Sequence, residues 1–91
     1  MLTYRAAWAF DRELDPITVG KYANFAKFKA SGMVNDCVDR CIQAHGGYGF
    51  SEEYEIIWFY EAARLLKTAP INNELILCFT AEHDLGLPRS Y

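Results

Sequence analysis

One long helical pattern constrains the fold of this chain more than any other feature. Apolar residues recur at helical spacing from Pro16 to Gly46 and Gly47, a stretch of about 30 residues without an internal proline. With a rise of ~1.5 Å per residue, such a helix is ~45 Å long, far longer than most helices of globular proteins. The apolar positions are Tyr22, Phe25, Ala26, Met33, Val34, Cys37, Val38, Cys41 and Ile42. Other helices must pack along this rod to bury its apolar side.

Three further segments carry helix signals. Residues 2–12 place apolar side chains at helical spacing, and Ser51 is expected to cap a helix that is apolar almost all the way round. Asn72 or Asn73 is expected to cap a last helix that runs to about residue 84. No segment shows the alternation typical of a half-buried strand. Because the connections are short, we predict an all-α protein, an up-and-down four-helix bundle.

Length and charge narrow the class of protein. With 91 residues and 52% hydrophobic content, the chain is one small domain. A net charge of −3 with mixed signs leaves no basic stripe for nucleic acid or an anionic membrane. The longest uncharged run, from Cys41 to Ser51, is too short to cross a bilayer, and residues 1–5 lack the layout of a signal peptide. We expect a soluble, cytoplasmic protein without nucleic-acid or membrane partners.

The three cysteines do not predict a disulfide framework. Cys37, Cys41 and Cys78 are an odd set without the spacing of small secreted proteins. Cys37, Cys41 and His45 lie four residues apart on one helical face, which suggests a metal site. The apolar residues around them favour reduced, buried thiols instead, and we expect no metal.

The segment Gln43-Ala44-His45-Gly46-Gly47-Tyr48-Gly49-Phe50 differs most from ordinary bundle sequence. It places an amide, an imidazole and bare backbone at one tight turn. Glycines let a ligand approach the main chain, and Gln43 can hydrogen-bond a base edge or a phosphate oxygen. A glycine-rich helix C-cap explains the same glycines equally well. A helix C-terminus is unfavourable for anions, so any phosphate contact there depends on loop N–H groups.

Four elements of the sequence together resemble the end of the acyl-CoA dehydrogenases. They are Leu2 to Trp8 (LTYRAAW), Ala26-Lys27, the segment from Gln43 to Gly49, and Glu53-Tyr54 followed by Ala63-Arg64. These elements occur in the right order and spacing over nearly the whole chain, and Gln-x-His-Gly-Gly-Tyr-Gly is the most specific. Residues 1–91 therefore look like the C-terminal helical domain of that family, beginning within a helix and truncated at the N-terminal side.

The resemblance implies an FAD-dependent oxidoreductase that oxidises acyl-CoA thioesters between the α and β carbons. It also implies a homo-oligomer, with electron-transfer flavoprotein as a candidate partner. In that family the Gln-x-x-Gly-Gly segment contacts the adenosine and pyrophosphate parts of FAD, which makes Gln43, Gly46 and Gly47 candidate cofactor contacts. The region before the last helix reaches the flavin in the family, so Asn72 and Glu74 are further candidates.

One departure from the family pattern concerns the catalytic base. Many members have Glu-Gly-Thr just before the last helix, where this chain has Pro70, Ile71 and Asn72. Proline cannot accept a proton, and some members carry the base on an earlier helix that this chain does not contain. No catalytic residue is therefore assigned. Glu74 is interpreted as an acid favoured by the helix dipole rather than as a base.

The remaining aromatic and histidine side chains are interpreted as structural. His45 is expected to cap the long helix or lie in the core, and His83 is expected at the surface. Tyr54, Trp58 and Tyr60 are expected in the core.

Two functions remain open. The chain is either a domain of a flavoenzyme, inactive by itself, or a non-catalytic helical association module derived from such an enzyme. A metal-carboxylate bundle is set aside because the sequence has no Glu-x-x-His pair. In both remaining cases the apolar third helix must be covered, so we expect a dimer or higher oligomer.

Overall fold

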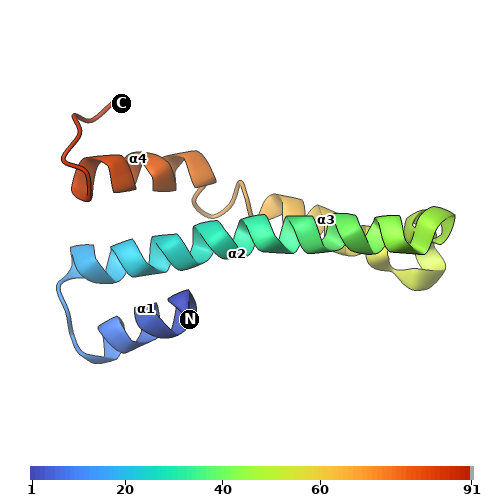
Figure 1. Ribbon diagram of the computed structural model, residues 1–91, viewed down its shortest axis with the longest axis horizontal. Helices are drawn as coiled ribbons and strands as arrows, with labels where there is room; N and C mark the ends of the chain where they lie inside the picture. The colour runs from blue at the N-terminus through green and yellow to red at the C-terminus, as the bar shows by residue number, and fades with distance from the viewer. Residues whose placement is uncertain (91) are drawn as a thin grey trace. The chain divides into compact units, whose positions relative to one another are not determined.

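The computed structural model describes residues 1–90, and these contain helices and no strand. The elements are α1 (Leu2–Asp11), α2 (Pro16–His45), the 3-10 helices η1 (Gly46–Phe50) and η2 (Glu52–Tyr54), α3 (Ile56–Leu65) and α4 (Asn73–His83) (Figure 1). The predicted all-α class with four helices is confirmed. None of the helices within residues 1–90 is both long enough and apolar enough to span a bilayer.

Helix α2 has the predicted length of 30 residues. Its start is set by Asp15, whose carboxylate accepts a hydrogen bond from the backbone N–H of Thr18 at 2.9 Å. This satisfies one of the N–H groups that have no partner within the helix. Hydrogen bonds from the side chain and then the backbone of Thr18 hold the pKa of Asp15 below its ordinary value.

The helices form two compact units that share α2. Unit 1 consists of Met1–Lys29 and the C-terminal segment from Asn73, and unit 2 consists of Ala30–Asn72. Unit 1 therefore holds α1, the first part of α2 and α4. Unit 2 holds the rest of α2, both 3-10 helices and α3.

In unit 1, the side chains of Arg5 and Tyr22 join α1 to α2. The Arg5 guanidinium lies 4.2 Å from the centroid of the Tyr22 ring, and its Nη2 donates to the Tyr22 hydroxyl at 2.9 Å. Cation–π contacts at exposed sites contribute about 0.5–1 kcal/mol. Close to this pair, Ala9 of α1 is fully buried.

The contacts between α2 and α4 in unit 1 are of two kinds. Lys21 forms an ion pair with Asp84 at 2.6 Å, and the half-buried Lys27 donates to the side-chain oxygen of Asn73 at 2.9 Å. Ile76, which lies between Asn73 and Asp84 in the sequence, is 2% exposed and is the buried residue of α4. The two lysines thus bracket α4, one near each end.

In unit 2, a buried amide links α2 to α3. Ser31, Asn35 and Val38 are the buried residues of α2, and their spacing marks one helical face. The Asn35 side-chain nitrogen donates to the Ser31 carbonyl at 2.8 Å and to the Ala63 carbonyl at 2.6 Å. Ala63 is 2% exposed, which lets α3 lie close to α2.

The start of the third helix differs from the prediction. Ser51 does act as a cap, because its Oγ accepts from the N–H of Glu53 at 3.1 Å, but it caps η2 rather than a long helix. Glu55 then adopts a left-handed conformation with φ 57°, and α3 begins only at Ile56. The chain changes direction at Glu55, so the predicted single helix becomes two.

The expectation of buried cysteines is wrong for two of the three. Cys37 and Cys41 are exposed and Cys78 is half-buried, and all three thiols are free. The inner face of α2 in unit 2 is set by Ser31, Asn35 and Val38, so Cys37 and Cys41 point to other sides. Across the described part of the chain, no three His, Cys, Asp or Glu side chains gather as a metal site.

The expectation of core positions for the aromatic residues near and in α3 is also wrong. Tyr54 is 51%, Trp58 63% and Tyr60 41% exposed. Ala63 is the only buried residue of α3. The structure thus leaves uncovered the apolar surface that the sequence placed in a core, which is typical of an interaction surface.

Candidate functional site

The candidate site is the corner where α2 ends and the chain turns into η1. Helix α2 ends at His45, and Gly46 has a φ of +57°. This left-handed residue directly after the helix is the usual C-terminal stop, and glycine adopts it without a steric cost. Gln43 is exposed on the last turn of α2, and its side chain forms no hydrogen bond or ion pair within residues 1–90.

The three glycines of the corner have different structural roles. A Cβ at Gly49 would lie 2.6 Å from the backbone oxygen of Ile42, so Gly49 is required for close packing of the turn on α2. A Cβ at Gly46 would meet no atom within 4 Å, but its positive φ explains the glycine. Gly47 has neither feature, because its Cβ would also meet nothing within 4 Å and its φ is not left-handed. The fold of this chain gives no reason for a glycine at residue 47.

The imidazole of His45 is oriented by the helix that it ends. Its Nδ1 lies 2.9 Å from the carbonyl oxygen of Cys41, and a carbonyl only accepts, so Nδ1 carries the proton. His45 is exposed and so does not lie in the core, and this bond holds its ring against the last turn of α2. In the neutral ring, Nε2 is then the acceptor.

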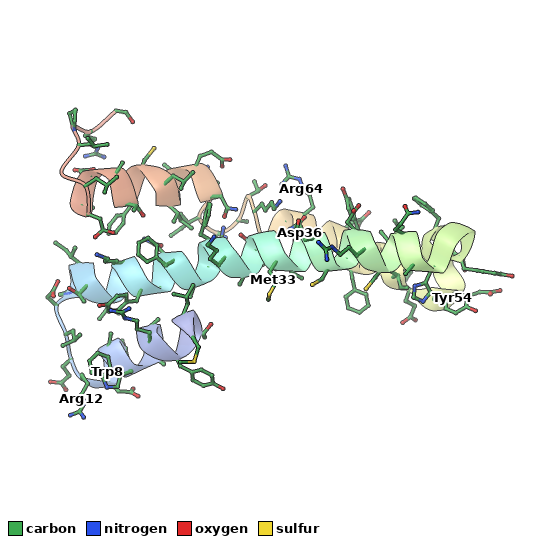
Figure 2. The ribbon with its side chains drawn as sticks, viewed as in Figure 1. Trp8, Arg12, Met33, Asp36, Tyr54 and Arg64 are labelled. Atoms are coloured by element: carbon green, nitrogen blue, oxygen red, sulfur yellow. The ribbon has the colours of Figure 1, made fainter. Side chains whose placement is uncertain are left out.

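Three rings meet at the corner. The Tyr54 ring lies 5.7 Å from the His45 ring and 5.5 Å from the Tyr48 ring, centroid to centroid, and the two tyrosines meet edge to face. Figure 2 shows Tyr54 beside the C-terminal end of α2. Tyr48 is 63% and Tyr54 51% exposed, so the cluster is held together while much of its surface stays accessible.

Acidic residues predominate in the sequence that follows the corner. Residues 41–63 contain four acids, Glu52, Glu53, Glu55 and Glu61, and no Lys or Arg. The C-terminal end of α2 adds the negative end of a helix dipole. Because Arg40 precedes this segment and Arg64 follows it, the charge along this part of the chain is mixed and does not by itself select a neutral ligand.

Of the other two candidate residues, Asn72 belongs to the same unit as this corner and Glu74 does not. Asn72 is half-buried and follows α3 at the end opposite to η2, so the ten residues of α3, ~15 Å of helix, separate it from the glycines. Glu74 is exposed in the first turn of α4 and belongs to unit 1. The structure therefore brings Gln43, Gly46 and Gly47 together, but it does not bring Asn72 to them.

Similarity to known proteins decides the family. A family model described as "Acyl-CoA dehydrogenase, C-terminal domain" matches residues 1–75. The chain belongs to the acyl-CoA dehydrogenase family.

Individual relatives agree with this membership. Over all 91 residues the chain is 38% identical to acyl-CoA dehydrogenase FadE12 of Mycobacterium tuberculosis H37Rv. The aligned region is 100% of this chain and 23% of FadE12. It is 35% identical over 65 residues to the caffeyl-CoA reductase-Etf complex subunit CarC of Acetobacterium woodii, covering 71% of the chain and 16% of that protein. The chain thus spans less than a quarter of the length of these curated relatives. No solved structure is significantly similar to it.

Acyl-CoA dehydrogenases depend on FAD, and the corner residues fit a part of such a dinucleotide. At Gly47 the main chain borders open space where any other residue would place a side chain, and the Gln43 amide beside it can donate and accept hydrogen bonds.

Sequence reasoning missed the contact that anchors the start of α4. Lys27 belongs to the family-like Ala26-Lys27 element, but its partner Asn73 was considered only as a helix cap. A signal was present, because a lysine between Ala26 and Phe28 in an apolar stretch needs a polar partner. Which of the two asparagines, Asn72 or Asn73, meets it depends on how α3 leads into α4.

Proposed function

We propose that this chain is the C-terminal helical domain of an FAD-dependent acyl-CoA dehydrogenase and contributes flavin contacts and subunit association to α,β-dehydrogenation of acyl-CoA thioesters. Gln43, Gly46 and Gly47 contact the adenosine end of the cofactor, and Asn72 and Glu74 are further candidate contacts. When bound, FAD supplies the hydride acceptor for the reaction. The domain itself supplies no catalytic base, since Pro70 stands where many relatives carry the glutamate.

The observation that carries the cofactor role is Gly47. Gly46 and Gly49 are both explained by the fold, one by its left-handed φ and the other by contact with Ile42. Gly47 is explained by neither, and the open space beside its Cα is where a ligand can touch the main chain. A side chain at residue 47 would occupy that space.

The test is the substitution Gly47→Ala, with the bulkier Gly47→Leu beside it, in the complete flavoenzyme. We expect the dissociation constant for FAD to rise by about tenfold or more, equivalent to ~1.4 kcal/mol, and the larger side chain to have the larger effect. The dissociation constant is measured by titrating the apoenzyme with FAD and following flavin fluorescence. Gly32→Ala is the matched control, because a Cβ there also meets nothing within 4 Å but lies in the middle of α2. Unchanged FAD affinity in both Gly47 variants would remove the cofactor role.

Subunit association is supported by the uncovered aromatic residues of α3. Trp58 and Phe59 are each 63% exposed, and exposed apolar surface of this kind is usually covered by another chain. We expect Trp58→Lys to lower the oligomeric state in light scattering at high protein concentration. A monomeric parent chain under the same conditions would contradict the role.

The electron acceptor is proposed to be an electron-transfer flavoprotein. The Acetobacterium woodii relative is described as a subunit of a caffeyl-CoA reductase-Etf complex. The complete enzyme, supplied with acyl-CoA, is expected to reduce purified electron-transfer flavoprotein, which is followed by its flavin absorbance. Failure to reduce it while reducing an artificial dye would refute this partner.

A second candidate function, a non-catalytic association module, is favoured by the same exposed residues of α3. This function predicts that affinity capture with the chain recovers a full-length flavoenzyme and that the Gly47 substitutions do not affect the capture. The enzyme-domain function predicts instead that the Gly47 substitutions change flavin content. The two measurements together separate the two functions.

A further inference from the structure

We propose that Lys27 of α2 is a positioning residue for the flavin. Its ammonium group holds Asn73, the first residue of α4, and thereby fixes the direction in which the first turn of α4 presents Glu74. The inference rests on the proposed function, in which Glu74 is a candidate flavin contact, and it gives Lys27 the role of orienting that contact.

The first argument is the hydrogen bond itself. The Nζ of Lys27 donates to the side-chain oxygen of Asn73 at 2.9 Å, although the two residues are 46 positions apart in the sequence. Both residues are half-buried. A hydrogen bond from an ammonium group is roughly twice as strong as one between neutral groups, and partial burial strengthens it because less water surrounds it. The bond therefore fixes Asn73 against α2.

The second argument is that α4 is attached in unit 1 without Lys27. Near the other end of α4, Lys21 forms an ion pair with Asp84 at 2.6 Å. Ile76 is 2% exposed, so apolar packing also holds the helix. Partial removal of an ammonium group from water is unfavourable unless a hydrogen bond compensates for it. Because the ion pair and the packing already attach α4, the Lys27 bond has a narrower purpose, which is to fix the start of the helix.

The third argument concerns the rotation of α4 about its own axis. Successive residues of an α-helix point about 100° apart, so residues three apart share a face and residues two apart lie on nearly opposite sides. Asn73 and Ile76 are three apart, and Asn73 contacts α2 through Lys27. Glu74 is two residues before Ile76 and is exposed. The bond to Asn73 and the burial of Ile76 therefore turn Glu74 away from α2.

The fourth argument is that burial alone does not fix this rotation. The hydrophobic effect is non-directional, so the packing of Ile76 allows the first turn of α4 to rotate by a small angle. A hydrogen bond has a preferred length and angle, and Lys27 provides one at the residue next to Glu74. Groups that contact a ligand must be held within about 0.5 Å of their productive positions. Lys27 thus acts on the flavin through Glu74 and not by touching it.

The experiment measures the dissociation constant for FAD in the complete apoenzyme, by titration followed through flavin fluorescence. Lys27→Met removes the ammonium group and keeps an unbranched side chain. It is expected to raise the dissociation constant by roughly 2- to 30-fold, the range for residues that act through another residue. Asn73→Asp keeps an acceptor for Lys27 and should retain the parent affinity. Lys21→Met is the matched control, because it breaks the ion pair with Asp84 at the far end of α4 and should leave the dissociation constant unchanged.

A double-mutant cycle tests whether Lys27 acts through Glu74. Glu74→Ala alone is expected to weaken FAD binding. In the Glu74→Ala background, Lys27→Met should add little, because a positioning residue has no effect once the group that it positions is gone. At saturating FAD, the visible absorbance of the bound flavin reports its surroundings, and both single variants should shift it in the same direction. Fully additive losses would show that Lys27 acts independently of Glu74 and would overturn the proposal.

The remaining outcomes separate this inference from the proposed function. If Lys27→Met and Lys21→Met weaken FAD binding equally, both act through the stability of unit 1 and Lys27 has no positioning role. If Lys27→Met changes neither the dissociation constant nor the absorbance while Gly47→Leu weakens FAD binding, the proposed function stands and the inference is overturned. If Gly47→Leu also has no effect, the proposed function fails as well.

Discussion

The side-chain amide of Asn35 in α2 caps the carbonyl of Ala63 in α3, at 2.6 Å between Nδ2 and O. The helical partner of that carbonyl would be the N–H of Lys67, but Lys67 bonds to the Arg64 carbonyl instead. Asn35 thus satisfies a carbonyl that the end of α3 leaves open, and both residues are buried.

We therefore expect Asn35→Ala to destabilise unit 2 by about 2 kcal/mol, because it removes two hydrogen bonds and leaves a buried carbonyl unpaired. Urea unfolding followed by circular dichroism measures the change in the free energy of unfolding. The exposed neighbour Asp36 provides the control, since Asp36→Ala should alter that free energy by no more than about 0.5 kcal/mol. Equal effects of the two substitutions would show that the Asn35 bonds contribute little.

Gly49→Ala is expected to lower the melting temperature, whereas Gly47→Ala is not. A Cβ at residue 49 would lie 2.6 Å from the Ile42 carbonyl oxygen, which is backbone and cannot move aside, so strain of about 1–3 kcal/mol is expected. A Cβ at residue 47 meets open space. Thermal unfolding of the two variants under identical conditions makes the comparison, and a similar loss in both would contradict the roles assigned to these glycines.

Glu55→Gly should stabilise the chain by about 0.5–1 kcal/mol. Glu55 has a φ of 57°, a left-handed conformation that costs a non-glycine residue about 1–2 kcal/mol, and part of this gain is lost to the greater backbone entropy of glycine. Glu55→Ala keeps the steric cost and removes only the charge, so it separates the two effects. A gain in Tm with alanine equal to that with glycine would attribute the effect to charge.

The cap at Asp15 should make stability depend on pH in the acid range. The pKa of Asp15 is lowered by its hydrogen bonds with Thr18, so the folded state binds this proton less readily than the unfolded state. The stabilisation is complete above the ordinary carboxyl pKa and is lost as the pH falls through the lowered value. Asp15→Asn keeps a capping side chain and should abolish this contribution. The measurement is the free energy of unfolding from neutral to acid pH, and identical profiles for parent and variant would contradict the prediction.

Local patterns predicted the helices well. The start of α2 follows from Asp15 and Pro16, and its end follows from Gly46, because caps and glycine stops act through neighbouring residues only. The late start of α3 was not predictable in the same way. Glu55 takes a conformation that is rare for glutamate, and nothing in its immediate sequence marks it.

Tertiary contacts explain the predictions that were wrong. The helical spacing of apolar residues in the sequence of α2 identifies its apolar positions. It does not determine which of these positions face α3. The buried side passes through Asn35 and Val38, which leaves Cys37 and Cys41 at the surface. At the corner, the sequence identifies three glycines, whereas the distinction between Gly47 and Gly49 depends on the position of the Ile42 backbone.

The open space beside Gly47 has a consequence for natural variation. Selection for folding alone places no constraint on this residue, so a chain released from its enzymatic role should accumulate other amino acids at position 47 while it retains glycine at position 49. The relative rates of substitution at these two neighbouring glycines would then record how long a lineage has continued to use the cofactor.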